Sequence, residues 1–500
     1  MRRRDIIRAA VAVPVAARAA LASGAGLQPF DPAMLREIAR ETASNPFRAP
    51  DSKLPDSLAK LDYNQYRDVR FRPDHAIWRG TGLPFQIQLF HRGFIYSERV
   101  DLYEVTDGKA LPILYSPEMF DFGKLGRPQP ADLGYAGFRI HAPFNRADYF
   151  DEVSVFLGAS YFRAVGKGQA YGLSARGLSI RTGNPGGEEF PLFRSFWIER
   201  PAKKSAAIVV HALLDSPSAA AAFRFTIRPG ADTVFDTEMT LFPRTDLSEA
   251  GIGTITSMFL FDANSRNKID DYRPAVHDSN GLLMLNGNGE RLWRPLGNPN
   301  DLQVSAFGDA SPKGFGLMQR KRDFAYYEDL EAKYERRPSL WVEPIGDFGK
   351  GAVTLVEIPT RKEIHDNIVA FWRPDTGLKA KGEFAYKYLL HWCAAPPGRQ
   401  ALASVVDTRA GLNLDENARL FVLDIVGDRL QPVSTDPSLR LDVSTDRGTI
   451  RNPVVQANSH IRGLTASFEL VPAGPVAELR AQLRNDNQPV SEVWVYRWTR

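Results

Sequence analysis

The sequence predicts an all-β protein, with a large N-terminal β domain followed by a smaller immunoglobulin-like β-sandwich domain. Short runs of aromatic and β-branched residues recur along the chain, and turn residues separate them. Period-two alternation is the third observation, and it is clearest at Phe223–Ile227. The turn residues Pro229 and Gly230 follow, and Val234–Leu241 is the expected partner strand.

Two helices are expected to interrupt the strands. The first runs from Asp31 to about Ser44, where apolar residues have helical spacing, Asp31 can cap the N-terminus and Pro32 suits the first turn. The second is predicted at Phe324–Arg336 and is ended by Pro338. Further strands are predicted at Arg194–Glu199, Ala206–Leu214, Ala352–Ile358, Ile368–Trp372 and Phe384–Trp392.

A domain boundary is predicted at Pro396, Pro397 and Gly398, since this turn-forming run separates two groups of strands. The large domain would then cover residues 23–395 and the small one residues 399–500. The spacing of the later strands is typical of a β-sandwich. These strands are expected at Leu420–Val426, Leu439–Ser444, Ala466–Leu470, Ala477–Leu483 and Val493–Trp498.

Residues 1–22 have the pattern of a twin-arginine signal peptide. Arg3 and Arg4 are followed by a spacer, two apolar residues and Arg8. The apolar stretch at 9–17 is too short to span a bilayer, and small residues at 20–22 suit a cleavage site. The pattern predicts export to the periplasm in the folded state, and the alternative is a plain basic N-terminus.

The composition excludes several classes of protein. Of the 500 residues, 43% are hydrophobic and 24% are charged, which is unlike a disordered chain, a collagen or a coiled coil. No apolar run of about 18 residues occurs, so a multi-pass membrane protein is excluded. Residues 1–22 hold five arginines and one aspartate, so the rest of the chain has 58 basic and 58 acidic residues. This balance argues against nucleic acid as a partner and favours a neutral ligand.

Neither a cofactor nor a metal site is predicted. The chain lacks a phosphate-binding Gly-Lys-Ser/Thr loop, a Gly-x-Ser-x-Gly elbow and a His-Glu-x-x-His motif. Gly251 and Gly253 lack the rest of a dinucleotide fingerprint. The single cysteine, Cys393, allows no internal disulfide and no cysteine-ligated metal cluster.

Two His-Asp pairs are candidates for catalytic chemistry. His277 and Asp278 lie in a loop-like stretch, and His365 and Asp366 lead into the strand predicted at Ile368–Trp372. Loop ends mounted on a rigid β scaffold commonly carry catalytic carboxylates. The alternative is that each aspartate caps a turn by accepting hydrogen bonds from nearby backbone N–H groups.

Aromatic residues make up 11% of the chain and recur beside polar side chains, as at Tyr161–Arg163, Tyr334 and Phe371–Trp372. A flat aromatic face packs against the apolar face of a pyranose, and neighbouring polar groups bond its hydroxyls. The pattern therefore favours a neutral oligosaccharide in a groove. The alternative is that these side chains pack in the core.

Five stretches of this sequence resemble the glucans biosynthesis protein G/D family, which acts in making osmoregulated periplasmic glucans. The likeness runs from about Phe30 to the C-terminus, and the twin-arginine start is similar to the D branch. The matching stretches are Leu133–Arg139, Phe156–Val165, Tyr171–Leu178, Pro312–Leu317 and Arg337–Pro344.

The resemblance implies a galactose-mutarotase-like β-supersandwich followed by an immunoglobulin-like domain. It also implies action on linear β-1,2-glucan, as an endo-β-1,2-glucanase that inverts the anomeric centre or as a transglycosylase. Family positions match Asp366 as the general acid, Asp278 as the general base and Tyr334 as a substrate-binding residue. Inversion needs a water between the carboxylates, hence a separation of roughly 6.5–9.5 Å or more. Partial burial of Asp366 would keep it protonated.

One departure from the family concerns the short segment between Gly411 and the strand at Leu420, where some hydrolytic relatives carry a longer, Trp-containing loop. A proton path that is less shielded from solvent would favour transfer of the glucan to a sugar hydroxyl, or it would make hydrolysis slow. The alternative function is a non-catalytic factor that binds glucan and guides chains emerging from an inner-membrane glucan synthase.

Overall fold

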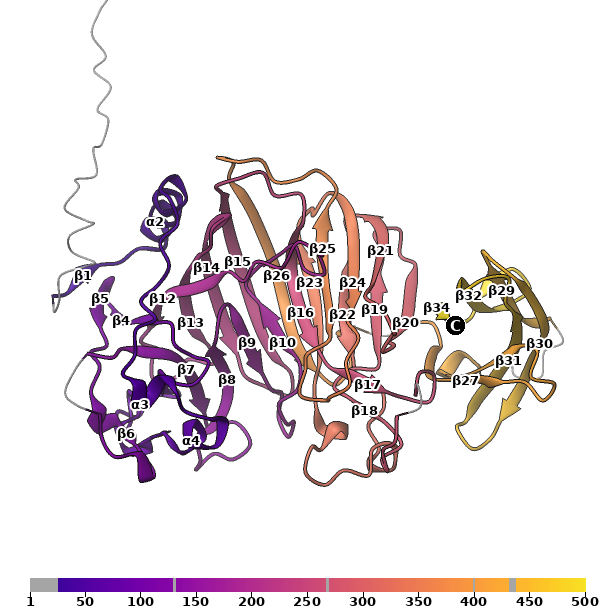
Figure 1. Cartoon of the computed structure of the whole chain (residues 1–500), viewed down its shortest axis with the longest axis horizontal. Coiled ribbons are helices and arrows are strands. Elements are labelled where there is room, and N and C mark those ends of the chain that lie inside the picture. Colours follow the sequence, from indigo (N-terminus) through magenta and orange to yellow (C-terminus); the bar gives the residue numbers. More distant parts are fainter. Residues whose placement is uncertain (1–25, 129–131, 267–268, 399–400, 431–437) are drawn as a thin grey trace, which may run out of the picture.

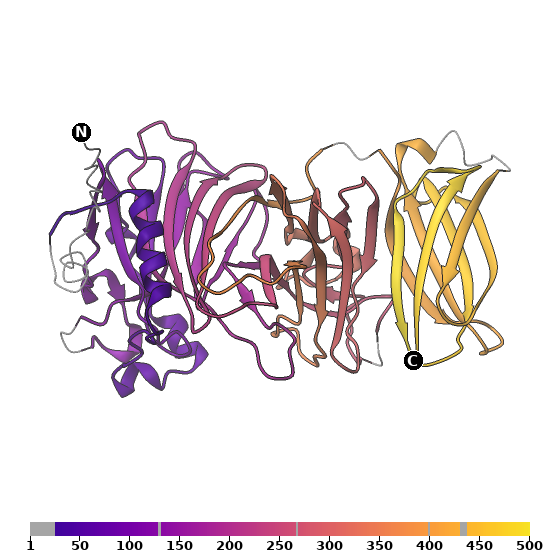
Figure 2. The same cartoon turned by 90° about the horizontal axis from the view of Figure 1, so that it is seen from above.

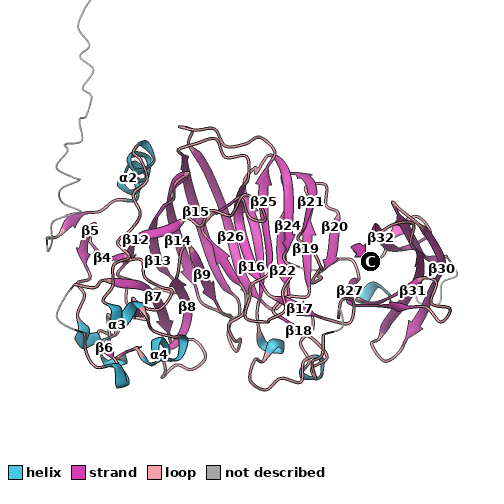
Figure 3. Ribbon diagram, viewed as in Figure 1, coloured by secondary structure: helices cyan, strands magenta, loops and turns pink. Residues whose placement is uncertain are grey.

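The computed structural model describes residues 26–128, 132–266, 269–398, 401–430 and 438–500 (Figure 1). Within these ranges the chain is mostly β-strand, with a few short helices at the periphery (Figure 3). The predicted all-β fold class is confirmed. No helix in the described ranges is both long and apolar enough to cross a bilayer.

The larger main sheet runs almost the whole length of the molecule. Neighbouring strands in its first half are β1 (Gln28–Pro29), β5 (Lys109–Pro112), β4 (Asp101–Thr106), β12 (Leu192–Glu199), β13 (Ile208–Asp215), β14 (Ala219–Arg228), β15 (Thr233–Pro243) and β26 (Phe384–Cys393). The second half continues with β23 (Ser339–Ile345), β22 (Gly314–Met318), β19 (Gly281–Leu285), β20 (Arg291–Pro295), β34 (Val493–Thr499), β32 (Val476–Asn485) and β29 (Leu439–Thr445), and β33 (Gln488–Pro489) pairs with β32.

The second main sheet packs face to face against the first. Its strand order is β21 (Gln303–Ala310), β24 (Lys350–Glu357), β25 (Ile368–Pro374), β16 (Ala250–Ser257), β10 (Ser174–Arg176), β9 (Tyr161–Ala164), β8 (Asp151–Leu157), β7 (Tyr135–Ala142) and β3 (Gln86–His91), with β11 (Ser179–Ile180) beside β16. Nearly all of these pairings are antiparallel, and the predicted β14–β15 hairpin is confirmed.

Aromatic side chains from both sheets fill the space between them. The Phe162 ring lies 5.1 Å from that of Phe225 and 5.7 Å from that of Phe235, between ring centroids. Phe235 in turn lies 4.8 Å from Trp392. Period-two alternation puts one face of each strand into this core, so many of the aromatic residues considered for sugar binding are core residues instead.

Helix α2 (Pro32–Ser44) covers β13 to β15 at one end of the molecule (Figure 2). Asp31 caps its N-terminus by accepting from the Ala33 N–H, as predicted. Leu35 and Ala39 are buried against the sheet, and Arg244 donates to the Thr42 carbonyl at the last turn. The remaining short elements are α3 (Asp56–Ala59), α4 (Tyr63–Asp68), the β2 (Arg70–Phe71) and β6 (Phe120–Asp121) pair, and the 3-10 turns η1 (Pro73–His75), η2 (Pro117–Met119) and η3 (Gly123–Leu125).

The C-terminal strands form two facing sheets at the opposite end from α2 (Figure 2). One sheet contains β27 (Ser404–Leu412), β28 (Arg419–Val426), β31 (Gly463–Val471) and β30 (Thr449–Asn458), and η6 (Asp428–Leu430) follows β28. The other comprises β29, β32 and β34, and it joins the larger main sheet because β34 runs parallel to β20. The predicted boundary at residues 396–398 falls between β26 and β27, and separate folding of the two parts stays a prediction.

The helix predicted at Phe324–Arg336 is wrong. The segment contains only two 3-10 turns, η4 (Phe324–Tyr326) and η5 (Tyr334–Arg336). The Asp329 carboxylate accepts hydrogen bonds from the backbone of Glu331 and Ala332, which offers the chain an alternative to helix. Lys333 adopts a left-handed conformation with φ of 50°, which a continuous right-handed helix does not allow.

Candidate functional site

Asp278 lies in a buried turn between β18 (Val276–His277), which pairs with β17 (Phe259–Phe261), and β19. Its backbone N–H donates to the Met258 carbonyl at 2.8 Å, and the residue is only 4% exposed. The carboxylate accepts a hydrogen bond from the Arg337 guanidinium and forms an ion pair with it. Asp278 therefore does not cap a turn, which was the alternative to a catalytic role.

Three charges set the protonation of Asp278. Burial raises the pKa of its carboxyl above the ordinary value, and the positive charge of Arg337 acts against this rise. The negative charge of Asp366 raises the pKa further, whereas Arg163 on β9 lowers it. Hydrogen bonds bring the two aspartates to one region, because the Asp278 N–H donates to the Met258 carbonyl and Asn367, next to Asp366, bonds the backbone of the adjacent Phe259.

The ring of Tyr334 packs against the guanidinium of Arg337. The Arg337 Cζ atom is 4.2 Å from the centroid of the Tyr334 ring, a cation–π arrangement. The Tyr334 hydroxyl donates to Glu363 Oε2 at 3.0 Å. Burial raises the pKa of Tyr334, so its hydroxyl stays protonated and can act as a donor.

Asp366 lies near the end of the loop at residues 359–366, which enters β25. Buried Asn367 fixes one end of this loop, with side-chain bonds to the backbone of Phe259. Asn298 fixes the other end by bonding both the N–H and the carbonyl of Thr360. Between these anchors Asp366 is exposed, and its carboxylate makes no hydrogen bond or ion pair with other described residues.

The negative charge of Asp366 also reaches Tyr161 on β9. Burial raises the pKa of the Tyr161 hydroxyl, and the Asp366 charge adds to the rise. The Tyr161 ring lies 4.7 Å from the Arg176 Cζ atom, and Arg176 forms an ion pair with Glu188 at 2.5 Å. The two aspartates are therefore brought to one region that also holds tyrosine and arginine side chains.

Two features of the structure bear on the roles predicted for Asp366 and Tyr334, which stay predictions. Asp366 is exposed, so the partial burial that was expected to keep it protonated is absent in this structure. Tyr334 is only 2% exposed, and Arg337 lies over its ring, so that face is not open to a sugar. Neither position fits a site that is fully assembled before a ligand binds.

A buried chain of charges extends from His277, next to Asp278, to the C-terminal strands. His277 Nε2 lies 3.4 Å from Asp262 Oδ2, and Lys321 Nζ lies 2.8 Å from both Asp262 Oδ1 and Asp407 Oδ1. Burial acts to raise the pKa of Asp262, but the neighbouring Lys321 and His277 outweigh it and hold that pKa well below its usual range. Asp407 lies on β27, so the chain of charges joins the two parts of the protein.

Sequence reasoning missed Arg337, Glu363, Asp262 and Lys321 as parts of this region. Arg337 stands at the start of one of the family-like stretches, but nothing in the sequence indicates that it pairs with Asp278. The other three carry no local motif. Among the described residues, no group of three or more His, Cys, Asp or Glu side chains is placed to hold a metal ion.

The connection after Gly411 is short, as expected: β27 ends at Leu412 and β28 begins at Arg419. The Asn413 side chain accepts from the backbone N–H groups of Asn417 and Ala418, which closes the turn locally. The effect of this short turn on catalysis stays a prediction.

Comparison with known proteins identifies a matching protein family. Residues 30–498 match the profile of the family described as "Periplasmic glucan biosynthesis protein, MdoG". This chain belongs to the MdoG family. A glucans biosynthesis protein G from Rhodopseudomonas palustris (strain BisA53) is 57% identical over the full length of both chains. One from Bradyrhizobium diazoefficiens is 54% identical over the full length of both, and one from Vibrio cholerae is 51% identical over 94% of this chain and 87% of its own length.

Membership of the MdoG family confirms the resemblance and links the chain to periplasmic glucan biosynthesis. The assignment to the D branch stays a prediction, and the compared relatives bear the name protein G. Residues 1–22, on which the twin-arginine prediction depends, lie outside the described residues.

Proposed function

We propose that this MdoG-family protein acts on linear β-1,2-glucan in the periplasm, as an anomer-inverting glycoside hydrolase or transglycosylase. Export through the twin-arginine route is part of the proposal. The observation that carries the proposal is that the two aspartates, although far apart in the sequence, are held beside neighbouring residues: the Asp278 N–H donates to the Met258 carbonyl, and Asn367, next to Asp366, bonds the backbone of Phe259. Two carboxylates at one site are what general acid–base cleavage of a glycosidic bond needs.

In this mechanism Asp366 is the general acid. Its exposed carboxyl loses contact with water when a sugar covers it, which favours the protonated form. It then donates its proton to the departing glycosidic oxygen as an oxocarbenium-like transition state develops. The exposed loop, fixed at Asn298 and Asn367, lets Asp366 approach a bound chain while its ends stay in place.

Asp278 is the general base. Arg337 favours its ionised form and orients it, while burial and Asp366 raise its pKa, which strengthens it as a base. It accepts a proton from the attacking water, either directly or through intervening hydroxyls. In the transferase version, a sugar hydroxyl takes the place of that water. Inversion needs a separation of roughly 6.5–9.5 Å between the two carboxylates, which leaves room for the attacking water or sugar hydroxyl.

Tyr334 is proposed to bind the substrate through its hydroxyl, because its ring is covered. Glu363, which now accepts from that hydroxyl, lies on the same loop as Asp366. A sugar hydroxyl that replaced Glu363 would release this contact and leave the loop free to move toward the glucan.

A second candidate function is a non-catalytic factor that binds glucan and guides it from an inner-membrane synthase. The exposure of Asp366 and the pairing of Asp278 with Arg337 favour this alternative, because they describe a site that is not assembled for catalysis. A carrier would need a glucan-binding surface but not both carboxylates.

The decisive experiment is to incubate the purified protein with linear β-1,2-glucan and to analyse product lengths and the anomer formed first. Turnover by the wild type, lost in Asp366→Asn and Asp278→Asn, is expected. Asp375→Asn is the matched control, because Asp375 is an exposed carboxylate just beyond the other end of β25. Wild-type protein that binds the glucan without shortening or rearranging it would overturn the catalytic proposal and leave the carrier.

A further inference from the structure

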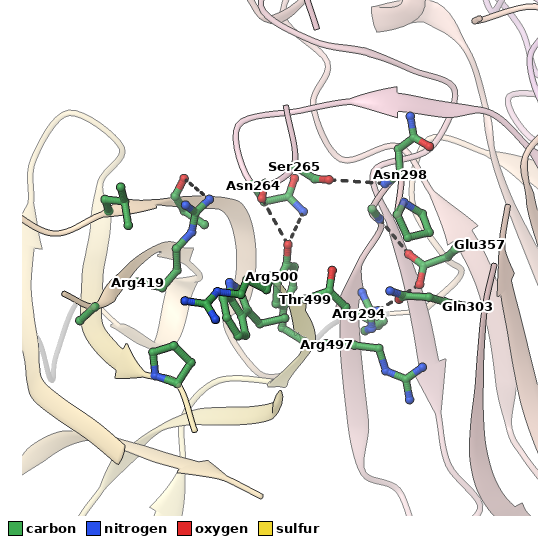
Figure 4. A pocket seen from close by; sticks show the side chains of 18 of the residues that line it. Asn264, Ser265, Arg294, Asn298, Gln303, Glu357, Arg419, Arg497, Thr499 and Arg500 are labelled. Carbon is green, nitrogen blue, oxygen red and sulfur yellow. Dashed lines mark hydrogen bonds and ion pairs between the residues drawn. The ribbon is translucent and has the colours of Figure 1, made fainter. Parts of the chain in front are cut away.

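A second cavity lies between the C-terminal strands and the main sheets (Figure 4). Its volume is about 570 Å³, within the range of small-molecule sites. One wall comes from the loops after β17 and β20 and from β21, and the other from the turn at 412–418 and from β34. Asp278, Tyr334 and Asp366 do not line it, so it is distinct from the proposed catalytic site.

Ion pairs hold two of the arginines that line this cavity. Arg294 pairs with Glu357 at 3.1 Å, and Arg497 pairs with Glu478 at 2.5 Å. Figure 4 shows Arg294 and Glu357 side by side on one wall. Arg419, Arg500 and Glu416 also line the cavity and make no ion pair with other described residues.

Several polar groups in the cavity remain available to a ligand. Within the described residues, the side chains of Gln303 and Arg500 make no hydrogen bond or ion pair, and both are at least partly exposed. The Nε atom of Arg419 is buried and has no partner. These amide and guanidinium groups are planar donors that suit the vicinal hydroxyls of a sugar.

An aromatic surface accompanies these donors. Trp498 is half-buried and lines the cavity, whereas the ring of Tyr496 on the same strand is buried and stacked against Trp494. An indole or phenol face packs against the apolar face of a pyranose while its neighbours bond the hydroxyl edge. A flat indole face beside planar amide and guanidinium groups points to a carbohydrate as the ligand.

We propose that this cavity is a second carbohydrate-binding site, which holds a distant stretch of the glucan chain whose other part lies at Asp278 and Asp366. The identity of the sugar rests on the proposed function. Asn298 in the cavity wall bonds Thr360, at the base of the loop that carries Asp366. The two sites therefore share one structural element, and a glucan bound in the cavity would contact the wall that anchors this loop.

The test is hydrogen–deuterium exchange with a linear β-1,2-gluco-oligosaccharide, in an Asp366→Asn background so that the probe is not consumed. We expect protection of residues 412–418 and 496–499 in addition to residues 359–366. The double variant Gln303→Ala/Arg500→Ala should lose the first protection and keep the second. Its matched control is Arg451→Ala/Gln456→Ala, an exposed pair on β30, which does not line the cavity.

The outcomes separate this inference from the proposed function. Protection confined to residues 359–366, or protection of 412–418 that survives in the double variant, would overturn the second site and leave the proposed function intact. No protection at any segment would overturn both. Calorimetry should agree: a glucan long enough to reach both sites should bind more weakly to the double variant than to the parent.

Discussion

Arg337 forms a buried ion pair with Asp278, the residue proposed as the general base. The same guanidinium lies over the ring of Tyr334, so one side chain contacts both residues. Removing it would change the protonation of Asp278 and uncover the ring of Tyr334 together. Its replacement is therefore the most informative single change at the site.

Replacement of Arg337 by glutamine should destabilise the protein by about 3 kcal/mol near neutral pH, because a buried carboxylate loses its partner. The pKa of Asp278 is raised in the folded state, so the protein loses free energy of unfolding as the pH rises from the unfolded-state pKa of this carboxyl through its folded-state pKa. Without Arg337 the folded-state pKa of Asp278 should rise further, so this pH range should extend to higher pH and the loss of stability across it should be larger. Urea unfolding between pH 4 and pH 8 measures this.

The control for that prediction is the double variant Arg337→Gln/Asp278→Asn, which has no carboxyl left to titrate at this position. Its stability should vary less with pH than that of Arg337→Gln alone. An equal pH dependence in the two variants would show that Asp278 is not the group responsible.

Replacement of Lys321 by methionine should cost roughly 3–5 kcal/mol, because it leaves two buried carboxylates, Asp262 and Asp407, without their shared cation. Lys379→Met is the matched control, since Lys379 pairs with Asp246 on the exposed surface and its loss should cost less than about 1 kcal/mol. Thermal unfolding of both variants makes the comparison. Similar losses in the two would mean that the buried pair adds nothing.

The same network predicts a dependence on acid. The pKa of Asp262 is depressed in the folded state, so its contribution to stability is present above its unfolded pKa and is lost as pH falls toward the folded value. Asp262→Asn should therefore flatten part of the acid limb of the stability curve. Denaturant titrations below pH 5 test this, and an unchanged acid limb would contradict it.

Replacement of Tyr334 by phenylalanine removes the hydroxyl that donates to Glu363. Because Glu363 also pairs with Arg273 at 2.8 Å, the loss of stability should be only about 1 kcal/mol. If the hydroxyl binds the glucan, KM should rise about tenfold while kcat changes less. Steady-state kinetics separate the two parameters, and an unchanged KM would remove Tyr334 from substrate binding.

Replacement of Phe162 by alanine should destabilise the protein by about 3–5 kcal/mol, because its ring packs against aromatic rings of both main sheets. Tyr272→Ala is the control, because Tyr272 is 78% exposed. Chemical unfolding of both variants would show the difference. A small loss of stability for Phe162→Ala would mean that the core can collapse into the space that the ring leaves.

Strand positions could be predicted from the sequence because they depend on local alternation and turn residues. The strands predicted at Phe223–Ile227 and Val234–Leu241 lie within β14 and β15, and Asp31 caps α2 as expected. The segment at 324–336 could not be predicted in the same way. Asp329 and the left-handed residues Glu328 and Lys333 favour turns over the helix that was predicted there.

The amino-acid sequence by itself determined the all-β class, the positions of twelve strands and the membership of the glucan biosynthesis family, since these depend on patterns along the chain. Only the tertiary structure decided that Asp366 is exposed, that Asp278 is buried against Arg337, and that a cavity lies between the C-terminal strands and the main sheets. Burial and charge pairing arise between residues distant in the chain, and local sequence carries no record of which distant groups will meet.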